Sequence, residues 1–170
     1  ITGADEHMVE IMGVSDGKNV AFARIIRKIR EYPIKNGSTA FAQLVDQHTD
    51  INLEKIEQLI KAIEFDGIFD VEFKYANEKS YFIELNFRNG APAYVSTLDG
   101  FNLAYNWYLL HAGNNKSSIE KKSNGIDMFM VENRDIINML KRQVPFVVWM
   151  KDFIIRCFFL VNTSGLMIIQ

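Results

Sequence analysis

Two short segments of this chain, residues 68–74 and 81–88, alternate between apolar and polar side chains. The first has Phe69, Val71 and Phe73 on one face and Asp70, Glu72 and Lys74 on the other. The second has Tyr81, Ile83, Leu85 and Phe87 on one face and Phe82, Glu84, Asn86 and Arg88 on the other. Successive side chains of a strand point to opposite faces of a sheet, so this period of two predicts two half-buried strands. The polar residues 76–80 between them predict a turn, and the strands then form an antiparallel hairpin.

The register of this hairpin brings acidic side chains together. A turn about Glu78 pairs Glu72 with Glu84 and Asp70 with Asn86. Two carboxylates directly opposite each other on a sheet repel, at a cost of up to ~1 kcal/mol in water and more where water is excluded. This face therefore needs a compensating feature.

Three kinds of compensation are open to the pair. One glutamate could be protonated, Lys74 or Arg88 could neutralise the pair, or a divalent cation could lie between the carboxylates. Mg²⁺ prefers oxygen ligands together with phosphate, and Glu72, Glu84 and the side-chain carbonyl of Asn86 supply such oxygens. The residues taken together favour a metal site over a solvated surface ion pair.

The rest of the chain predicts an α+β fold. Residues 7–30 form a second hairpin, because Asp16-Gly17 supplies the positive φ angles that a tight turn needs. A loop is expected across residues 33–39, and Asn52 is expected to cap a helix that ends near residue 66. The order strand, strand, helix, strand, strand predicts an antiparallel sheet with a helix packed on its apolar face.

Beyond about Thr97 the pattern becomes helical. Helices are expected over residues 101–111 and 134–142, while the apolar stretch after Pro145 fits either a helix or a strand. We therefore expect two parts, a sheet-bearing part from residue 1 to 97 and a mostly helical, apolar C-terminal extension from 98 to 170.

Composition excludes several classes of protein. The chain has 170 residues, 48% of them hydrophobic, and a formal net charge of −2, so it can bury a core and offers no basic surface for nucleic acid. Its one cysteine, Cys157, rules out an internal disulfide and suits a reducing, cytoplasmic setting. Charged residues at 151, 152 and 156 interrupt the apolar stretch 144–161, so no transmembrane segment is expected.

The run Glu84-Leu85-Asn86-Phe87-Arg88 follows Glu72 by twelve residues and resembles the Glu-x-Asn-x-Arg metal strand of the ATP-grasp superfamily. The match is nearest to its carbamoyl-phosphate-synthetase-like and D-aspartate-ligase-like branch. The resemblance implies that Glu72 and Glu84 bridge one or two Mg²⁺ or Mn²⁺ ions to the phosphates of ATP, and that Asn86 ligates the second ion. It also implies that Arg88 steadies the transferred phosphoryl group or the acyl-phosphate.

A weaker resemblance extends upstream. The basic run 27–30 and the Gly37-Ser38-Thr39 loop are similar to family segments that lie near the phosphates and the acceptor. Lys28 and Arg30 share one face of the expected strand, so both are candidates to bind an anion, with an exposed basic strand as the alternative. Residues 1–3 look like the end of the family's hinge.

The resemblance covers about residues 1–97 and is the C-terminal lobe of the ATP-grasp catalytic domain. The family's N-terminal nucleotide-binding half has no counterpart here, so the chain, which opens at Ile1, is expected to be a fragment that needs this upstream half as its partner. The resemblance implies an ATP-dependent carboxylate-amine ligase that forms an acyl-phosphate from small carboxylate and amine substrates. The alternatives are carbamoyl-phosphate formation and a non-catalytic binding module that retains the lobe. Self-association into a homo-oligomer stays open.

Three histidines are scattered along the chain without the spacing of metal ligands. We expect His7, His48 and His111 to be surface or capping residues.

Overall fold

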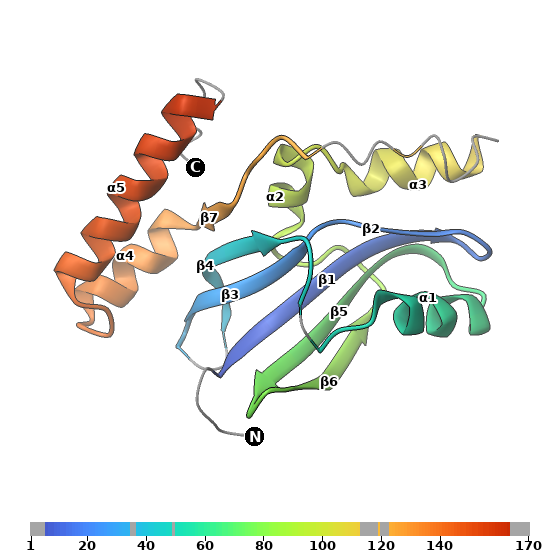
Figure 1. Cartoon of the computed structure of the whole chain (residues 1–170), viewed down its shortest axis with the longest axis horizontal. Coiled ribbons are helices and arrows are strands. Elements are labelled where there is room, and N and C mark those ends of the chain that lie inside the picture. The colour runs from blue at the N-terminus through green and yellow to red at the C-terminus, as the bar shows by residue number, and fades with distance from the viewer. Residues whose placement is uncertain (1–5, 35–36, 49, 113–118, 120–122, 164–170) are drawn as a thin grey trace.

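The computed structural model describes residues 6–34, 37–48, 50–112, 119 and 123–163, with side chains as far as Ile154. The strands are β1 (His7–Asp16), β2 (Val20–Phe22), β3 (Ile25–Tyr32), β4 (Ser38–Val45), β5 (Asp66–Ala76), β6 (Lys79–Asn86) and β7 (Met128–Met130). The helices are α1 (Leu53–Ala62), α2 (Ala93–Leu98), α3 (Leu103–His111), α4 (Glu132–Leu140) and α5 (Phe146–Thr163), as Figure 1 shows. The predicted hinge end at residues 1–3, most of the loop 114–123 and the side chain of Cys157 lie outside this description.

The strands form one antiparallel sheet in the order β6-β5-β1-β3-β4-β7, with β2 paired to the end of β1. The predicted α+β fold, an antiparallel sheet with packed helices, is confirmed. Hairpin formation at Asp16-Gly17 is also confirmed, since the Asp16 carboxylate accepts backbone N–H bonds from Lys18 and Asn19 at 2.9 and 2.6 Å. Gly17 has a φ of +86°, a conformation that glycine adopts without strain.

Two strands were not predicted from the sequence. The loop expected across residues 33–39 ends early, because β4 begins at Ser38. Residues 39–42 of β4 are all buried, so this strand shows no alternation between apolar and polar positions. A strand covered on both faces loses the period of two on which its recognition depends. The three-residue β7 pairs with β4 and is too short to show any period.

The first face of the sheet packs against α1. Ile56 and Ile60 are the buried residues of this helix, and they lie in one core cluster with Val9, Ile11, Val20, Ile25, Phe69 and Val71. Asn52 caps the helix as predicted, because its side-chain oxygen accepts the N–H of Lys55 at 3.2 Å.

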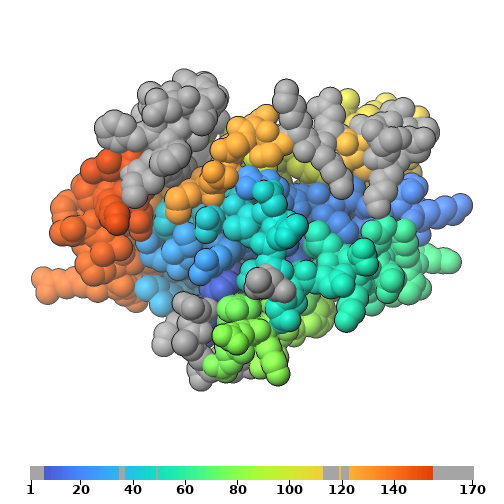
Figure 2. Space-filling model, in the orientation of Figure 1, coloured from blue at the N-terminus to red at the C-terminus, as the bar shows by residue number. Residues whose placement is uncertain are grey.

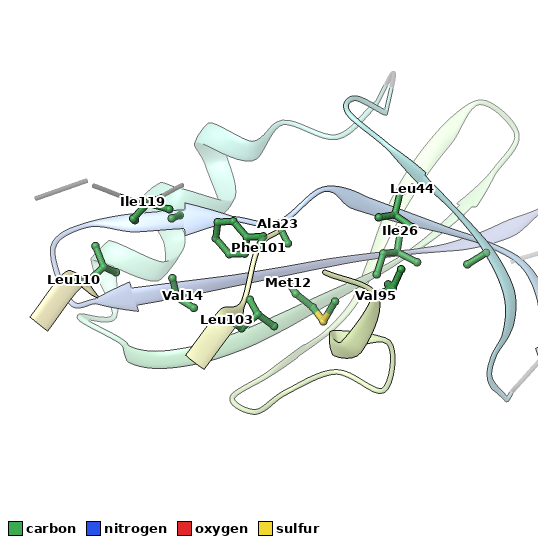
Figure 3. Close-up of a cluster of buried hydrophobic side chains, with 12 residues drawn as sticks. Met12, Val14, Ala23, Ile26, Leu44, Val95, Phe101, Leu103, Leu110 and Ile119 are labelled. Carbon is green, nitrogen blue, oxygen red and sulfur yellow. The ribbon is translucent and has the colours of Figure 1, made fainter. Parts of the chain in front are cut away.

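The second face packs against α2 and α3 along part of its length. Met12, Val14 and Ile26 from the strands meet Val95, Phe101, Leu103 and Leu110 in a second core cluster (Figure 3). In β1 the same face continues from Met12 to Glu10, where the side chains become charged. This face is therefore apolar under the helices and polar beyond them.

Helices α4 and α5 lie at the end of the molecule opposite α1 (Figures 1 and 2). The stretch after Pro145, undecided from sequence, is the helix α5. None of the described helices is both long and apolar enough to cross a membrane. β7 belongs to the same sheet as the preceding strands, and α2 and α3 pack against that sheet. The predicted division at residue 97 does not coincide with a change in packing and stays a prediction.

Candidate metal and phosphate site

A bulge in β6 sets the register on which the site depends. The turn residues Asn77 and Glu78 both have positive φ, 53° and 61°, as in a two-residue hairpin turn. Beyond the turn Phe73 pairs with Phe82, but the next pair is Glu72 with Glu84, so Ile83 is an extra residue in β6. The predicted opposition of Glu72 and Glu84 is confirmed.

The bulge also corrects the predicted faces of β6. Phe82 lies opposite Phe73, with ring centroids 5.9 Å apart, and so belongs to the apolar face rather than the polar one. Ile83, predicted on the apolar face, instead lines the same cavity as Glu84.

Three glutamates form a row across neighbouring strands. Glu10 of β1 is paired with Glu72 of β5, which is paired with Glu84 of β6. One step along the strands, Asp70 is paired with Asn86, as predicted. Carboxylate oxygens of Glu10, Asp70 and Glu72 lie within 4.8 Å of one another. We call Glu10, Asp70 and Glu72 the acidic group.

Lys28 neutralises part of the acidic group from β3. Its Nζ lies 3.3 Å from Glu10 Oε2 and 3.3 Å from Glu72 Oε2. The Lys28 side chain is 6% exposed and that of Glu10 is 2% exposed, so this pairing is buried. Burial alone would lower the pKa of Lys28, but the charges of Glu10 and Glu72 offset it and hold that pKa above its ordinary value.

The environment of Asp70 favours the protonated form of its carboxyl group. Burial, together with the negative charge of Glu10 beside it, raises the pKa of Asp70 to about 9. Burial also raises the pKa of Glu10, although Lys28 opposes the shift. The two side chains are hydrogen-bonded, and with Asp70 protonated its hydroxyl donates to Glu10. Asp70 Oδ1 is buried without a hydrogen-bond partner among the described residues.

Gly90 lets the loop after β6 approach the acidic group. A Cβ at this position would lie 2.6 Å from Glu10 Oε1 and 2.8 Å from Asp70 Oδ2. Only a residue without a side chain fits so close to two buried carboxyl groups.

The acidic group lies in the wall of a cavity of about 700 Å³. Other residues that line this cavity include Gly37, Ser38, Lys74, Ile83, Glu84 and Arg88. Asn86 Nδ2 donates to Glu84 Oε1 at 2.8 Å, and Arg88 Nη1 donates to the Asn89 carbonyl at 2.9 Å. Arg88 is exposed and lines the cavity, and among the described residues no carboxylate lies within ion-pair distance of it.

Of the predicted site residues, the structure brings Lys28, Glu72, Glu84 and Arg88 to this cavity, with Asn86 beside Glu84. Arg30 is engaged elsewhere. Its guanidinium binds Asp135 through two bonds of 2.9 and 2.6 Å, and Asp152 through one of 2.5 Å. Its predicted role toward an anion stays a prediction, and its contacts point to a link between the sheet and the C-terminal helices.

Glu10, the partner of Asp70 in the acidic group, was not predicted from the sequence. The available signal was a charged residue within the apolar run 8–14, on a strand whose residues 9–14 are all buried. Two of the histidines lie closer to each other than expected, since His7 Nε2 is 3.3 Å from His48 Nε2. The third, His111, pairs with Asp66 at 3.0 Å.

The residues present fit a hard divalent cation. Glu72, Glu84 and Asn86 offer oxygen atoms only, which is the donor set that Mg²⁺ prefers. Asp70 Oδ1, which is buried beside Glu72 without a hydrogen-bond partner among the described residues, is a further oxygen that a cation could meet. Such a site can hold a metal ion and the phosphates bound to it.

Comparisons with known proteins identify the fold. The chain is similar to a Campylobacter jejuni biotin carboxylase solved as a βγ-ATP complex, with a TM-score of 0.55 and 20% sequence identity over 75% of this chain and 30% of that one. It is also similar to the biotin carboxylase domain of a single-chain bacterial carboxylase, with a TM-score of 0.53 and 16% identity over 69% and 29% of the two chains. A third similar structure is the K. lactis urea amidolyase, with a TM-score of 0.54 and 15% identity over 72% of this chain and 8% of that one.

The sheet and its helices thus have the fold of an ATP-grasp lobe. No protein-family model and no curated protein matches the sequence. The chain spans less than a third of the length of each of these three solved chains.

Proposed function

We propose that this chain forms the metal and phosphate face of an ATP-dependent carboxylate-amine ligase. The observation that carries the proposal is the row Glu10, Glu72 and Glu84 with Arg88 on the wall of one cavity, and Asn86 beside Glu84, in a chain with the fold of an ATP-grasp lobe. Glu72, Glu84 and Asn86 would hold Mg²⁺ or Mn²⁺, which when bound neutralises phosphate charge and polarises the transferred phosphoryl group.

The chemistry that this face would serve has two steps. An oxygen of the substrate carboxylate attacks the γ-phosphorus of ATP, the bond to the β–γ bridging oxygen breaks, and ADP leaves. The amine nitrogen then attacks the acyl carbon, phosphate leaves, and the nitrogen gives up a proton. Neither step needs a covalent nucleophile from the protein, so its residues act by positioning and charge neutralisation.

Arg88 and Lys28 differ in what they could do for these steps. Arg88 is exposed at the cavity, and its planar guanidinium can bind two oxygens of a phosphoryl group or an acyl-phosphate at once. Lys28 is buried against Glu10 and Glu72, so it would orient the glutamates rather than reach the phosphates. The nucleotide would be enclosed between this lobe and a second, upstream one.

The second candidate is a related reaction in which bicarbonate is the phosphorylated carboxylate, as in carbamoyl-phosphate formation. The similarity to biotin carboxylase domains favours this candidate, since carboxylases belong to the same fold group. A survey of carboxylate substrates with and without an amine would distinguish the two.

Thermal unfolding in a magnesium titration, with and without ATP, tests the proposal. Mg²⁺ should raise the melting temperature of the wild-type chain, because a ligand that binds only the folded state stabilises it. Glu84→Gln should lose most of this rise. Glu78→Gln is the matched control, because it removes the same charge from the turn of the same hairpin, away from the cavity. Equal responses in all three proteins would refute the metal assignment.

A further inference from the structure

We propose that the ammonium group of Lys28 is a built-in cation that takes the place of a second divalent ion, so that this site binds one metal ion rather than two. The inference rests on the proposed function, since it concerns the same metal site. It makes Lys28 a positioning residue for Glu72 rather than a ligand of the nucleotide.

The geometry of Lys28 is that of a cation held by two carboxylates. Its Nζ is equidistant, at 3.3 Å, from an oxygen of Glu10 on β1 and an oxygen of Glu72 on β5. Lys28 itself lies on β3, so the ammonium joins three adjacent strands of the sheet. The Lys28 and Glu10 side chains are only 6% and 2% exposed. Water can therefore do little to solvate either charge if its partner is removed.

No other basic side chain among the described residues is placed to neutralise Glu10 and Glu72. Among the described residues, Lys28 is the one basic side chain within 4.0 Å of Glu10 or Glu72. Lys74, which also lines the cavity, pairs with Glu6, and Arg30 pairs with Asp135 and Asp152. Neutralisation of Glu72 by Lys74 or Arg88 was one of the alternatives that the sequence left open, and the cation that contacts Glu72 is instead Lys28 of β3.

The contacts of Lys28 also indicate where a metal ion can bind. Both Glu10 and Glu72 use their Oε2 atoms for the ammonium. Glu72 keeps Oε1 for another cation, and its neighbours on the side away from β1 are Glu84 and Asn86 of β6. A single ion on that side meets two glutamates and an amide oxygen, whereas a second ion beside Glu10 would meet the ammonium charge at close range.

Counting bound Mn²⁺ by electron paramagnetic resonance tests the inference. The wild-type chain should bind one ion, and Lys28→Met should bind a second one, because the acidic group then lacks its cation. Lys28→Arg keeps the charge and should bind one ion. Lys74→Met, which removes a positive charge from the same cavity without touching Glu10, should also bind one.

Two ions in the wild-type chain, or one ion in a folded Lys28→Met, would overturn the inference. If Lys28→Met unfolds without metal, millimolar Mn²⁺ should restore its circular dichroism and thermal transition, and failure to do so would also overturn it. The absence of any bound ion in the wild-type chain would instead reject the proposed function, and this inference with it.

Discussion

At the scale of single residues, the main feature of the site is that it contains more buried carboxyl groups than basic side chains to neutralise them. Glu10 and Asp70 are 2% and 1% exposed, and one ammonium group serves Glu10 and Glu72 together. The shortage is met by a proton on Asp70, whose pKa is raised to about 9. Proton and metal are thus alternative ways to relieve the same excess of negative charge.

This protonation predicts how stability depends on pH. Between the ordinary pKa of an aspartate, about 4, and pH 9, the folded state binds a proton at Asp70 that the unfolded state has lost. The free energy of unfolding should therefore fall as pH rises through this window. Asp70→Asn should make this fall smaller, although the raised pKa of Glu10 still contributes to it. The variant should be more stable than wild type by at least about 1 kcal/mol at pH 9, since each unit of pKa shift is worth about 1.4 kcal/mol.

Urea unfolding from pH 5 to 9 with a chelator present would measure this effect. Glu78→Gln, in an exposed turn, should give a curve parallel to that of the wild type. A parallel curve for Asp70→Asn as well would show that Asp70 is ionised in the folded state.

Arg88 offers a test of catalysis at the same scale. In the active enzyme Arg88→Lys should keep the fold and most of the affinity for ATP, but lose roughly 10- to 100-fold in kcat, because an ammonium cannot reproduce a planar fork of donors. Steady-state kinetics with ATP varied would separate kcat from KM. An unchanged kcat would place Arg88 outside the reacting groups.

At the scale of secondary-structure elements, the extra residue in β6 decides which side chains share a face. The two-residue turn alone would set Ile83 opposite Glu72, and the bulge moves Glu84 to that position instead.

A second feature at this scale is a set of ion pairs made by Arg30, which we call the Arg30 link. It joins β3 to α4 through Asp135 and to α5 through Asp152.

The Arg30 link predicts a large loss of stability on mutation. Arg30→Met should lower the free energy of unfolding by about 3–5 kcal/mol, because it leaves the fully buried Asp135 without its cation. Asp152→Asn should cost less, since the Asp152 side chain is 22% exposed and Arg30 keeps Asp135. Chemical denaturation would measure both, and a mild effect of Arg30→Met would return Arg30 to the candidates for anion binding.

At the scale of the whole molecule, the described elements make one lobe with its polar face open. A phosphate site that faces water works in a high dielectric, where preorganised charges lose most of their effect. The part of this chain that matches the two biotin carboxylase chains corresponds to 29% and 30% of their lengths.

We therefore expect the 170-residue chain by itself to bind ATP weakly, with a Kd of about 1 mM or more, worth roughly 4 kcal/mol or less. Calorimetry and an ATP hydrolysis assay on this chain, beside a longer polypeptide with an upstream nucleotide-binding half, would measure the difference. Robust turnover by the shorter chain would mean that its own cavity, with Ser38 and Lys28, is a sufficient phosphate site.

The sequence by itself determined the local features of this protein. The alternation in residues 68–88 predicted the hairpin of β5 and β6, and Asn52 marked the start of α1. The predicted pairing of Glu72 with Glu84 also needed the bulge at Ile83, which the alternation does not reveal. These features depend on neighbours a few residues apart, whose faces and hydrogen bonds follow from strand and helix periods. The order Glu-x-Asn-x-Arg also pointed to the ATP-grasp fold, which the structure has.

Only the tertiary structure decided which distant residues complete the site. Glu10 joins Glu72 because β1 pairs with β5 across 62 positions of sequence. Lys28 rather than Arg30 reaches them because the register of β3 against β4 shifts between these two residues, so they do not share one face of the strand as predicted. The strand β4 was not predicted because it is buried on both faces, so its sequence does not alternate between apolar and polar residues. Strand order and register are set by packing of the whole chain, and no local pattern encodes them.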